Sequence, residues 1–266
     1  YMVPFIIWWS ISSVLLKSFS LYRLLYAIWG GRLLGGVYWY VNCLVLTIIL
    51  FGWLLKLKKT KHQLFIIIVM YSIAIMESNL IDPYRTSTGL PLKLCFPWNI
   101  DVVLLSITYF AIGFWWNKVF ECTDHKTIYN IIWISSIIIL LVCIILNLFG
   151  YYEFFVDMKN SNYSNFLLTF VIPVCFFIMF YRISKYLEKT IVLKDLLIYI
   201  GKMSIIIMYT HIVVREILVK KICGEDYNVL TFVVTSITVA CIINIIIKRN
   251  NLIYFLLTGK GYKELL

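Results

Sequence analysis

Long stretches without a charged residue recur along this chain and limit the folds open to it. Three of them cover 127–152, 160–181 and 227–247. At 1.5 Å per residue, each can cross the roughly 30 Å hydrocarbon core of a membrane as a helix. The composition agrees, because 62% of the 266 residues are hydrophobic and only 14% are charged, proportions atypical of soluble domains. The sequence therefore predicts an all-α fold, a polytopic membrane helical bundle.

Polar and basic segments between the apolar stretches divide the chain into about eight predicted transmembrane helices. No linker marks a second domain, so residues 1–266 are expected to form a single membrane-embedded domain. The predicted spans lie at about 1–16, 37–55, 64–81, 101–117, 128–150, 164–181, 203–219 and 228–247.

The basic residues are distributed unevenly between the two predicted sides of the membrane. Of the 24 Lys and Arg residues, 15 lie in one set of connections and nine in the other. The positive-inside rule places the richer set, and with it both termini, in the cytoplasm of a multi-pass protein of the cell membrane. The net charge of +11 follows from this topology. Nucleic acid is therefore not an expected partner, whereas basic tracts such as 56–61 are expected to attract anionic membrane lipid.

The seven cysteines form no CxxC pair and no cluster with the spacing of metal ligands, so no metal site is predicted. Cys95 and Cys223 are the two that share the predicted outer face. A disulfide between them is an open alternative to two free thiols, since nothing in their spacing requires it.

Four residues at the predicted outer ends of the spans suggest a polar cavity. Trp39 and Asn42 lie in the first turns of the second span, Glu77 lies near the end of the third, and Asp101 opens the fourth. Carboxylate and amide groups accept hydrogen bonds from hydroxyl groups, and an aromatic face packs on sugar-ring CH groups, so the set suits a sugar. Two simpler interpretations stay open: Asp101 as a partner of the helix dipole, and Trp39 as part of the interfacial aromatic belt.

His211 is the single most informative residue, because it lies in the middle of a predicted span with Arg215 one turn later. Ionisable groups at membrane depth are costly, and neutral imidazole can accept a proton from a hydroxyl nucleophile. The alternative is a histidine that hydrogen-bonds a neighbouring helix and stabilises the bundle. The sequence contains no Walker loop, HExxH or dinucleotide glycine motif.

Three segments resemble, in order, those of the acyltransferase family three membrane proteins. GKMSIIIMYTHIVVREIL at 201–218 is similar to the family's late-helix "lGk.SL.iYllH" signature. GGVYWYVNCLV at 35–45 resembles its "lWFl.aLl" helix start, with Tyr40 and Val41 in place of Phe-Leu. PWNIDVVLLSITYFAIGFWW at 97–116 resembles the helix containing Asp101 in the fucose 4-O-acetylase-like branch. The opening YMVPFII is similar to the "lliPy" start of the family's third helix.

The resemblance implies an enzyme that transfers an acyl group, most often acetyl, from cytoplasmic acyl-CoA to a hydroxyl of a cell-envelope glycan or lipid-linked sugar. Acetyl-CoA or another acyl-CoA is then a co-substrate, with no bound cofactor. The family usually has ten spans, and its general base is a histidine in the first. We therefore expect a chain that lacks the first two helices and is inactive as a fragment, with no confident catalytic residue. His211 is the candidate for positioning the substrate, and the expected substrate-binding residues are Trp39, Asn42, Glu77, Asp101 and His211.

Two other functional classes remain open. A transporter or flippase-like protein for an envelope glycan lipid would also concentrate polar residues within the membrane, and it often has internal repeats and broken helices. No convincing repeat relates the two halves of this chain, and Pro173 is the one proline deep inside a predicted span. A structural or sensory membrane module is the third class.

Several structural expectations follow. The termini should lie on one face, and the connections 18–36 and 82–100 should be partly ordered, because each is longer than a tight helix connection. An exposed apolar groove with a polar notch is expected beside 1–16, and His211 is expected to line the same cavity as Asp101 or Glu77.

Overall fold

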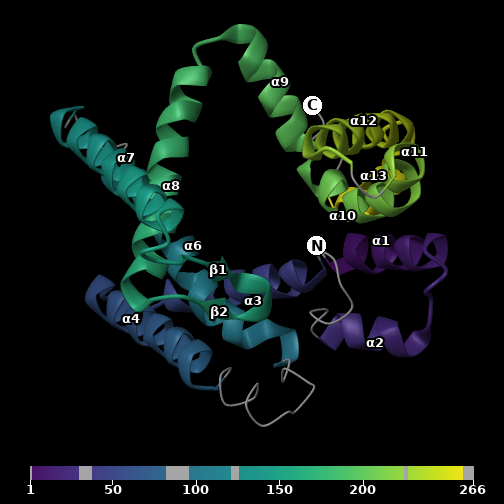
Figure 1. Ribbon diagram of the computed structural model, residues 1–266. Coiled ribbons are helices and arrows are strands. Elements are labelled where there is room, and N and C mark those ends of the chain that lie inside the picture. Colours follow the sequence, from purple (N-terminus) through teal and green to yellow (C-terminus); the bar gives the residue numbers. More distant parts are fainter. Residues whose placement is uncertain (1, 30–37, 82–95, 121–125, 225–226, 260–266) are drawn as a thin grey trace. The chain divides into compact units, whose positions relative to one another are not determined.

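The computed structural model describes residues 2–29, 38–81, 96–120, 126–224 and 227–259. Figure 1 shows that helices account for nearly all of this part of the chain, which confirms the predicted all-α class. Two compact units are distinguished, residues 1–42 with 191–266 and residues 43–190, and each is described by itself.

The first unit contains the helices at both ends of the chain. Its elements are α1 (Met2–Leu15), α2 (Leu21–Trp29), the first turn of α3 (Tyr38–Leu54), α9 (Ile191–Lys202), α10 (Ser204–Val214), the π-helix η4 (Arg215–Val219), α11 (Lys220–Cys223), α12 (Val229–Ile247) and α13 (Asn251–Thr258).

The second unit contains the rest of α3 and the longest helices. Its further elements are α4 (Thr60–Met76), the π-helix η1 (Glu77–Ile81), the 3₁₀ turn η2 (Pro97–Asn99), α6 (Ile100–Phe120), α7 (Lys126–Leu148), β1 (Val156–Asp157), η3 (Met158–Asn160), β2 (Asn162–Tyr163) and α8 (Phe166–Leu187).

Asparagine side chains begin three of the helices. The Oδ1 atoms of Asn165, Asn228 and Asn250 accept hydrogen bonds from backbone N–H groups in the first turns of α8, α12 and α13. These N–H groups have no partner within their own helices, and a short polar side chain satisfies them at the point where the helix begins. Gly259 ends α13 with φ 70°, a conformation that favours glycine.

Five described helices are long and apolar enough to cross a membrane, and they mark the chain as a membrane protein. They coincide with five of the eight predicted spans, at Thr60–Asn79, Pro97–Trp116, Ile128–Leu148, Phe166–Leu187 and Val229–Ile247.

At the other three predicted spans the helices are shorter or carry charges. The helices α1 and α3 have 14 and 17 residues. The run from α10 through η4 to α11 is continuous over 204–223, but it includes Arg215, Glu216 and Lys220. The count of eight spans therefore stays a prediction.

In the first unit, α10 packs against α1, α12 and α13. Trp8 of α1 stacks on Tyr209 of α10 at 6.4 Å between ring centroids, and its Nε1 donates to the carbonyl oxygen of Leu257 at 2.9 Å. That carbonyl belongs to the last turn of α13, where helix carbonyls lack an intrahelical donor. Trp8 thus joins three helices through one side chain.

Beside α1 lies an apolar cavity of about 350 Å³. Among the residues that line it, Ser12 and Thr210 bear hydroxyl groups, and the exposed groove with a polar notch expected beside 1–16 stays a prediction. The Thr210 hydroxyl donates to the carbonyl of Ile206 in its own helix. The cavity is lined by Trp8, Ile11, Ser12, Leu15, Thr210, Val213, Val214, Ile217, Leu218, Val239 and Ile243.

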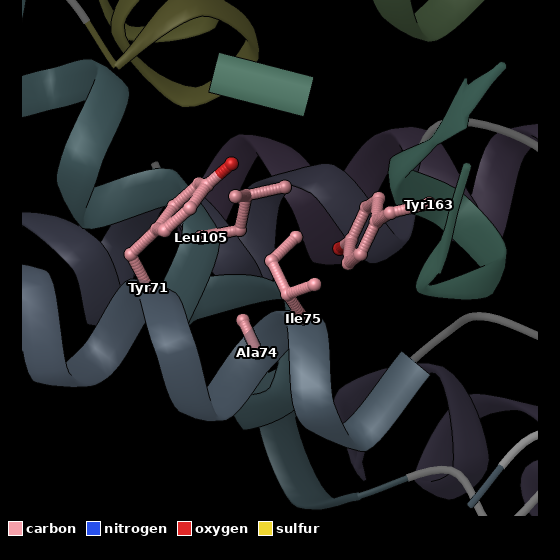
Figure 2. Close-up of a cluster of buried hydrophobic side chains, with 5 residues drawn as sticks. All are labelled: Tyr71, Ala74, Ile75, Leu105 and Tyr163. Carbon is pink, nitrogen blue, oxygen red and sulfur yellow. The ribbon is translucent and has the colours of Figure 1, made fainter. Parts of the chain in front are cut away.

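The second unit is built on two helix pairs, α4 with α6 and α7 with α8. Figure 2 shows the core that joins α4 and α6 to the short hairpin before α8, with Tyr71 and Tyr163 on either side of Leu105 and Ile75. The strands β1 and β2 pair antiparallel, with Val156 opposite Tyr163. The hairpin therefore lies over the end of α4, where the candidate site begins.

Of the two long connections expected to be partly ordered, 18–36 contains α2, and 82–100 contains η2 and the first residue of α6. Residues 30–37 and 82–95, and the first and last residues of the chain, lie outside the described residues. Cys95 also lies outside them, whereas Cys223 is an exposed free cysteine. The structure thus shows no disulfide at Cys223, and Cys95, its possible partner, cannot be described.

Candidate functional site

Glu77 and Asp101, which are 24 positions apart in the sequence, line one cavity of the second unit. Glu77 follows the last residue of α4 and begins the π-helix η1, and Asp101 is the second residue of α6. Both side chains are buried. The cavity has a volume of about 490 Å³, which is within the usual range for small-molecule sites. It is lined by Ile73, Met76, Glu77, Phe96, Ile100, Asp101 and Leu104.

The Glu77 carboxylate is held by the hairpin that lies over it. Ser161 Oγ donates to Glu77 Oε2 at 3.1 Å, and the Tyr163 hydroxyl lies 3.5 Å from the same Ser161 oxygen. The backbone N–H of Tyr163 donates to Ser78 Oγ at 2.9 Å. All four of these residues are buried, so the hydrogen bonds offset part of the cost of removing a carboxylate from water.

The backbone turns sharply just before Asp101. Trp98 and Asn99 both have positive φ, 57° and 54°, although neither is glycine. Such conformations cost free energy, and they persist where surrounding contacts stabilise them. Asn99 is fully buried, and α6 begins at the next residue. The turn therefore fixes Asp101 in the first turn of α6 at the cavity, a position that also suits the alternative role as a partner of the helix dipole.

Asn42 and Trp39 lie at the start of α3. The Asn42 side chain is fully buried, and its Nδ2 donates to the carbonyl oxygens of Ala27 and Ile28 at 2.9 and 3.3 Å. These carbonyls belong to the last turn of α2, so the amide donors of Asn42 stabilise the end of that helix. Trp39 is half-buried and meets Tyr40 edge-on at 5.9 Å. Their predicted binding of a substrate stays a prediction.

His211 is half-buried on α10, and its ring orientation follows from its own helix. Nδ1 lies 2.7 Å from the carbonyl oxygen of Met208 and 3.2 Å from that of Ile207. Because a carbonyl oxygen only accepts, Nδ1 carries a proton, and the lone pair of the neutral ring is then on Nε2. The ring also lies 6.3 Å from that of Phe232 of α12. His211 belongs to the first unit, and Glu77 and Asp101 to the second, so their common cavity stays a prediction.

Arg215, one turn after His211, pairs with the residue that follows it. Its Nη2 lies 2.8 Å from Glu216 Oε1, and Lys220 Nζ lies 3.0 Å from Glu216 Oε2. The three charges neutralise each other in part within two turns of the helix that continues α10. This arrangement explains how the segment accommodates ionisable residues directly after an apolar helix.

Sequence reasoning did not identify Ser161, Tyr163 or Asn99 as parts of the site. Ser161 is 84 positions from Glu77, and a serine in a polar connection carries no signal of a buried hydrogen bond. The PWN sequence at 97–99 does indicate a turn before α6, because proline favours the first residue of a helix, but it does not reveal the positive φ of Asn99.

The chemistry available at the cavity is that of two carboxylates in apolar walls. They can accept hydrogen bonds from ligand hydroxyl groups, and apolar walls strengthen such bonds by excluding water. Within the part of the chain that the structure describes, no three His, Cys, Asp or Glu residues are placed to hold a metal ion. Comparisons of the chain with protein families, with curated proteins and with solved structures found no match.

Proposed function

We propose that the protein is a membrane O-acyltransferase, which transfers an acyl group, most often acetyl, from acyl-CoA to a hydroxyl of a cell-envelope glycan or lipid-linked sugar. The observation that carries the proposal is the cavity shared by Glu77 and Asp101. Carboxylates are costly to bury at the ends of membrane helices, and a polyhydroxylated acceptor can donate further hydrogen bonds to them, in addition to those they already accept.

The second support is that Asp101 lies in the segment 97–116, which resembles a helix of the acyltransferase family three proteins. The same resemblance implies a general base in the family's first helix, and therefore not at His211. We therefore assign His211 a positioning role: with Nδ1 donating to its own helix, Nε2 is the atom that accepts a hydrogen bond from a substrate hydroxyl.

The test is transfer of radiolabel from acetyl-CoA to envelope glycans by the complete protein in native membranes. We expect incorporation to require the protein. Glu77→Gln and Asp101→Asn should each lower it at least about tenfold, because an amide replaces a charged acceptor with a weaker one. Glu153→Gln is the matched control, since Glu153 is an exposed carboxylate of the same unit. It should leave incorporation within about twofold.

A second candidate is a transporter for an envelope glycan lipid. It is favoured by the π-helix η1, because interrupted membrane helices with buried carboxylates are common at transport sites. The two functions give different results: protein-dependent movement of a glycan lipid without any incorporation of label would support the transporter and refute the acyltransferase.

A further inference from the structure

A second constellation, far from the candidate cavity in sequence, lies where α7 begins and α8 ends. The guanidinium carbon of Arg182 lies 5.0 Å from the ring centroid of Tyr129 and 6.0 Å from that of Trp133. Its Nη2 also donates to Oδ1 of Asn130 at 3.2 Å. Two aromatic rings and one hydrogen bond thus fix the plane of an exposed guanidinium.

Trp116 of α6 connects the Tyr129 ring to a second aromatic ring, that of Tyr181. The indole of Trp116 lies 6.3 Å from the Tyr129 ring and 5.8 Å from the Tyr181 ring, measured between centroids. Lys185 Nζ lies 5.8 Å from the centroid of Tyr181. Three helices therefore support two neighbouring cations on one aromatic cluster, and the cations lose little freedom when they bind a ligand.

Arg182 has no acidic partner in the part of the chain that the structure describes. The nearby Glu188 carboxylate lies 3.8 Å from Lys185 Nζ instead. One N–H group of the guanidinium is used by Asn130, and the other donors face no carboxylate among the described residues. A planar guanidinium with open donors matches the oxygens of a phosphate, to which it can bind in a bidentate manner.

The position of the cluster identifies the source of the phosphate. The candidate span of α7 begins at Ile128, and the candidate span of α8 ends at Leu187. The cluster therefore lies at one end of both spans. That is the depth of lipid headgroups, where Trp and Tyr are enriched. Exposed apolar side chains flank it on the same helices and offer a surface for acyl chains: Ile128, Ile131, Phe180 and Ile183.

We propose that Arg182, supported by Tyr129 and Trp133 and assisted by Lys185, binds the phosphate of an anionic phospholipid where α7 and α8 meet. The site is separate from the cavity of Glu77 and Asp101 and does not depend on the acyltransferase function. By the charge distribution of the sequence it is expected in the cytoplasmic leaflet, which carries anionic lipids.

The test is a titration of the purified full chain, in neutral detergent, with fluorescently labelled phosphatidylglycerol. Arg182→Gln should weaken binding at least about tenfold, the loss expected for a charge-assisted hydrogen bond. Arg249→Gln is the matched control: it removes the same charge from an exposed position after α12. It should change binding less than about twofold. Arg182→Lys retains the charge without the planar fork, and binding should fall at least about threefold.

Competition distinguishes the lipid from a soluble phosphate compound. Unlabelled phosphatidylglycerol should displace the probe, whereas phosphatidylcholine should need at least about a tenfold higher concentration because its headgroup has no net charge. Displacement by coenzyme A as effective as by phosphatidylglycerol would overturn the proposal in favour of a soluble phosphate ligand. Equal binding by the Arg182→Gln and Arg249→Gln proteins, both with wild-type helical content, would overturn it as well.

Discussion

Ser161 combines a buried hydrogen bond with an unfavourable backbone conformation. Its hydroxyl donates to the Glu77 carboxylate at 3.1 Å, its side chain is 1% exposed, and its φ is 52°. The hydrogen bond stabilises the folded chain, and the positive φ destabilises it for any residue with a Cβ atom. Two substitutions at this one position can separate the two effects.

We predict that Ser161→Ala lowers the free energy of unfolding by about 1.5–3 kcal/mol, the contribution of a hydrogen bond to a charged group. Ser161→Gly removes the same hydroxyl but relieves the backbone, so its loss should be smaller by about 1 kcal/mol. Denaturant titration in detergent micelles measures both. Ser135→Ala is the control, because the exposed Ser135 hydroxyl donates only to Ile132 of its own helix. If Ser161→Ala costs no more than this control, the Glu77 contact contributes nothing.

The helix α8 tolerates a proline because another helix supplies the missing hydrogen bond. Pro173 lacks the N–H that would reach the carbonyl of Thr169, four residues earlier. The Tyr109 hydroxyl of α6 donates to that carbonyl. Tyr71 of α4 donates in the same way to the carbonyl of Phe166 in the first turn of α8. Since lipid offers no donors, these two tyrosines link α8 to its neighbours at the places where its backbone needs them.

We predict that Tyr109→Phe lowers the free energy of unfolding by about 1–3 kcal/mol, because it leaves the Thr169 carbonyl without its donor. In a Pro173→Ala background the new backbone N–H can reach that carbonyl, so the same substitution should cost less than half as much. A double-mutant cycle from unfolding titrations in micelles gives the difference. Tyr186→Phe, at a position 70% exposed, is the control for loss of a hydroxyl. Equal costs of Tyr109→Phe in the two backgrounds would contradict this explanation of Pro173.

The elements that could be predicted from sequence are those whose signal is local. Five spans follow from uninterrupted apolar stretches, and the helix starts at Asn165 and Asn228 follow the rule for short polar caps. Glu77 and Asp101, which the sequence places at span ends, line one cavity, and their binding of a substrate stays a prediction. The contact of Glu77 with Ser161 depends on a hairpin that packs on another helix, and no local pattern contains that information. The hydrogen bond from the Asn42 amide to the end of α2 also joins two helices, so it too could not be predicted from a local pattern.

At the scale of the whole molecule, one segment decides the topology. The helical run 204–223 has 20 residues, enough for roughly 30 Å at 1.5 Å per residue, but it is not among the five apolar candidate spans. Its charges lie in its second half, where Glu216 pairs with Arg215 and Lys220. Paired charges near the end of a helix can reach the membrane surface, so the run can still cross. If it crosses, the two ends of the segment 185–223 lie on opposite sides.

We predict that this run crosses, with Cys223 outside the cell and residue 185 inside. Cys223 and Lys185 are both exposed in their units, and Cys223 is a free thiol. In a full chain whose other cysteines are serine, a membrane-impermeant maleimide should label Cys223 in intact cells. In a chain with Lys185→Cys as its sole cysteine, labelling should require permeabilised cells, because the positive-inside rule retains the neighbouring Arg182 and Lys189 in the cytoplasm.

The two labelled positions together test whether 204–223 crosses the membrane and in which orientation. Each other result therefore contradicts a different part of the prediction. Labelling of both positions from the same side would show that 204–223 does not cross and that eight spans is the wrong number. Labelling of residue 185 outside and Cys223 inside would retain the crossing and refute the orientation that the charges predict. A chain without any cysteine gives the background in both cell preparations. Inside placement of residue 185 would also put Arg182 in the leaflet that carries anionic lipids, as the proposed phosphate site requires.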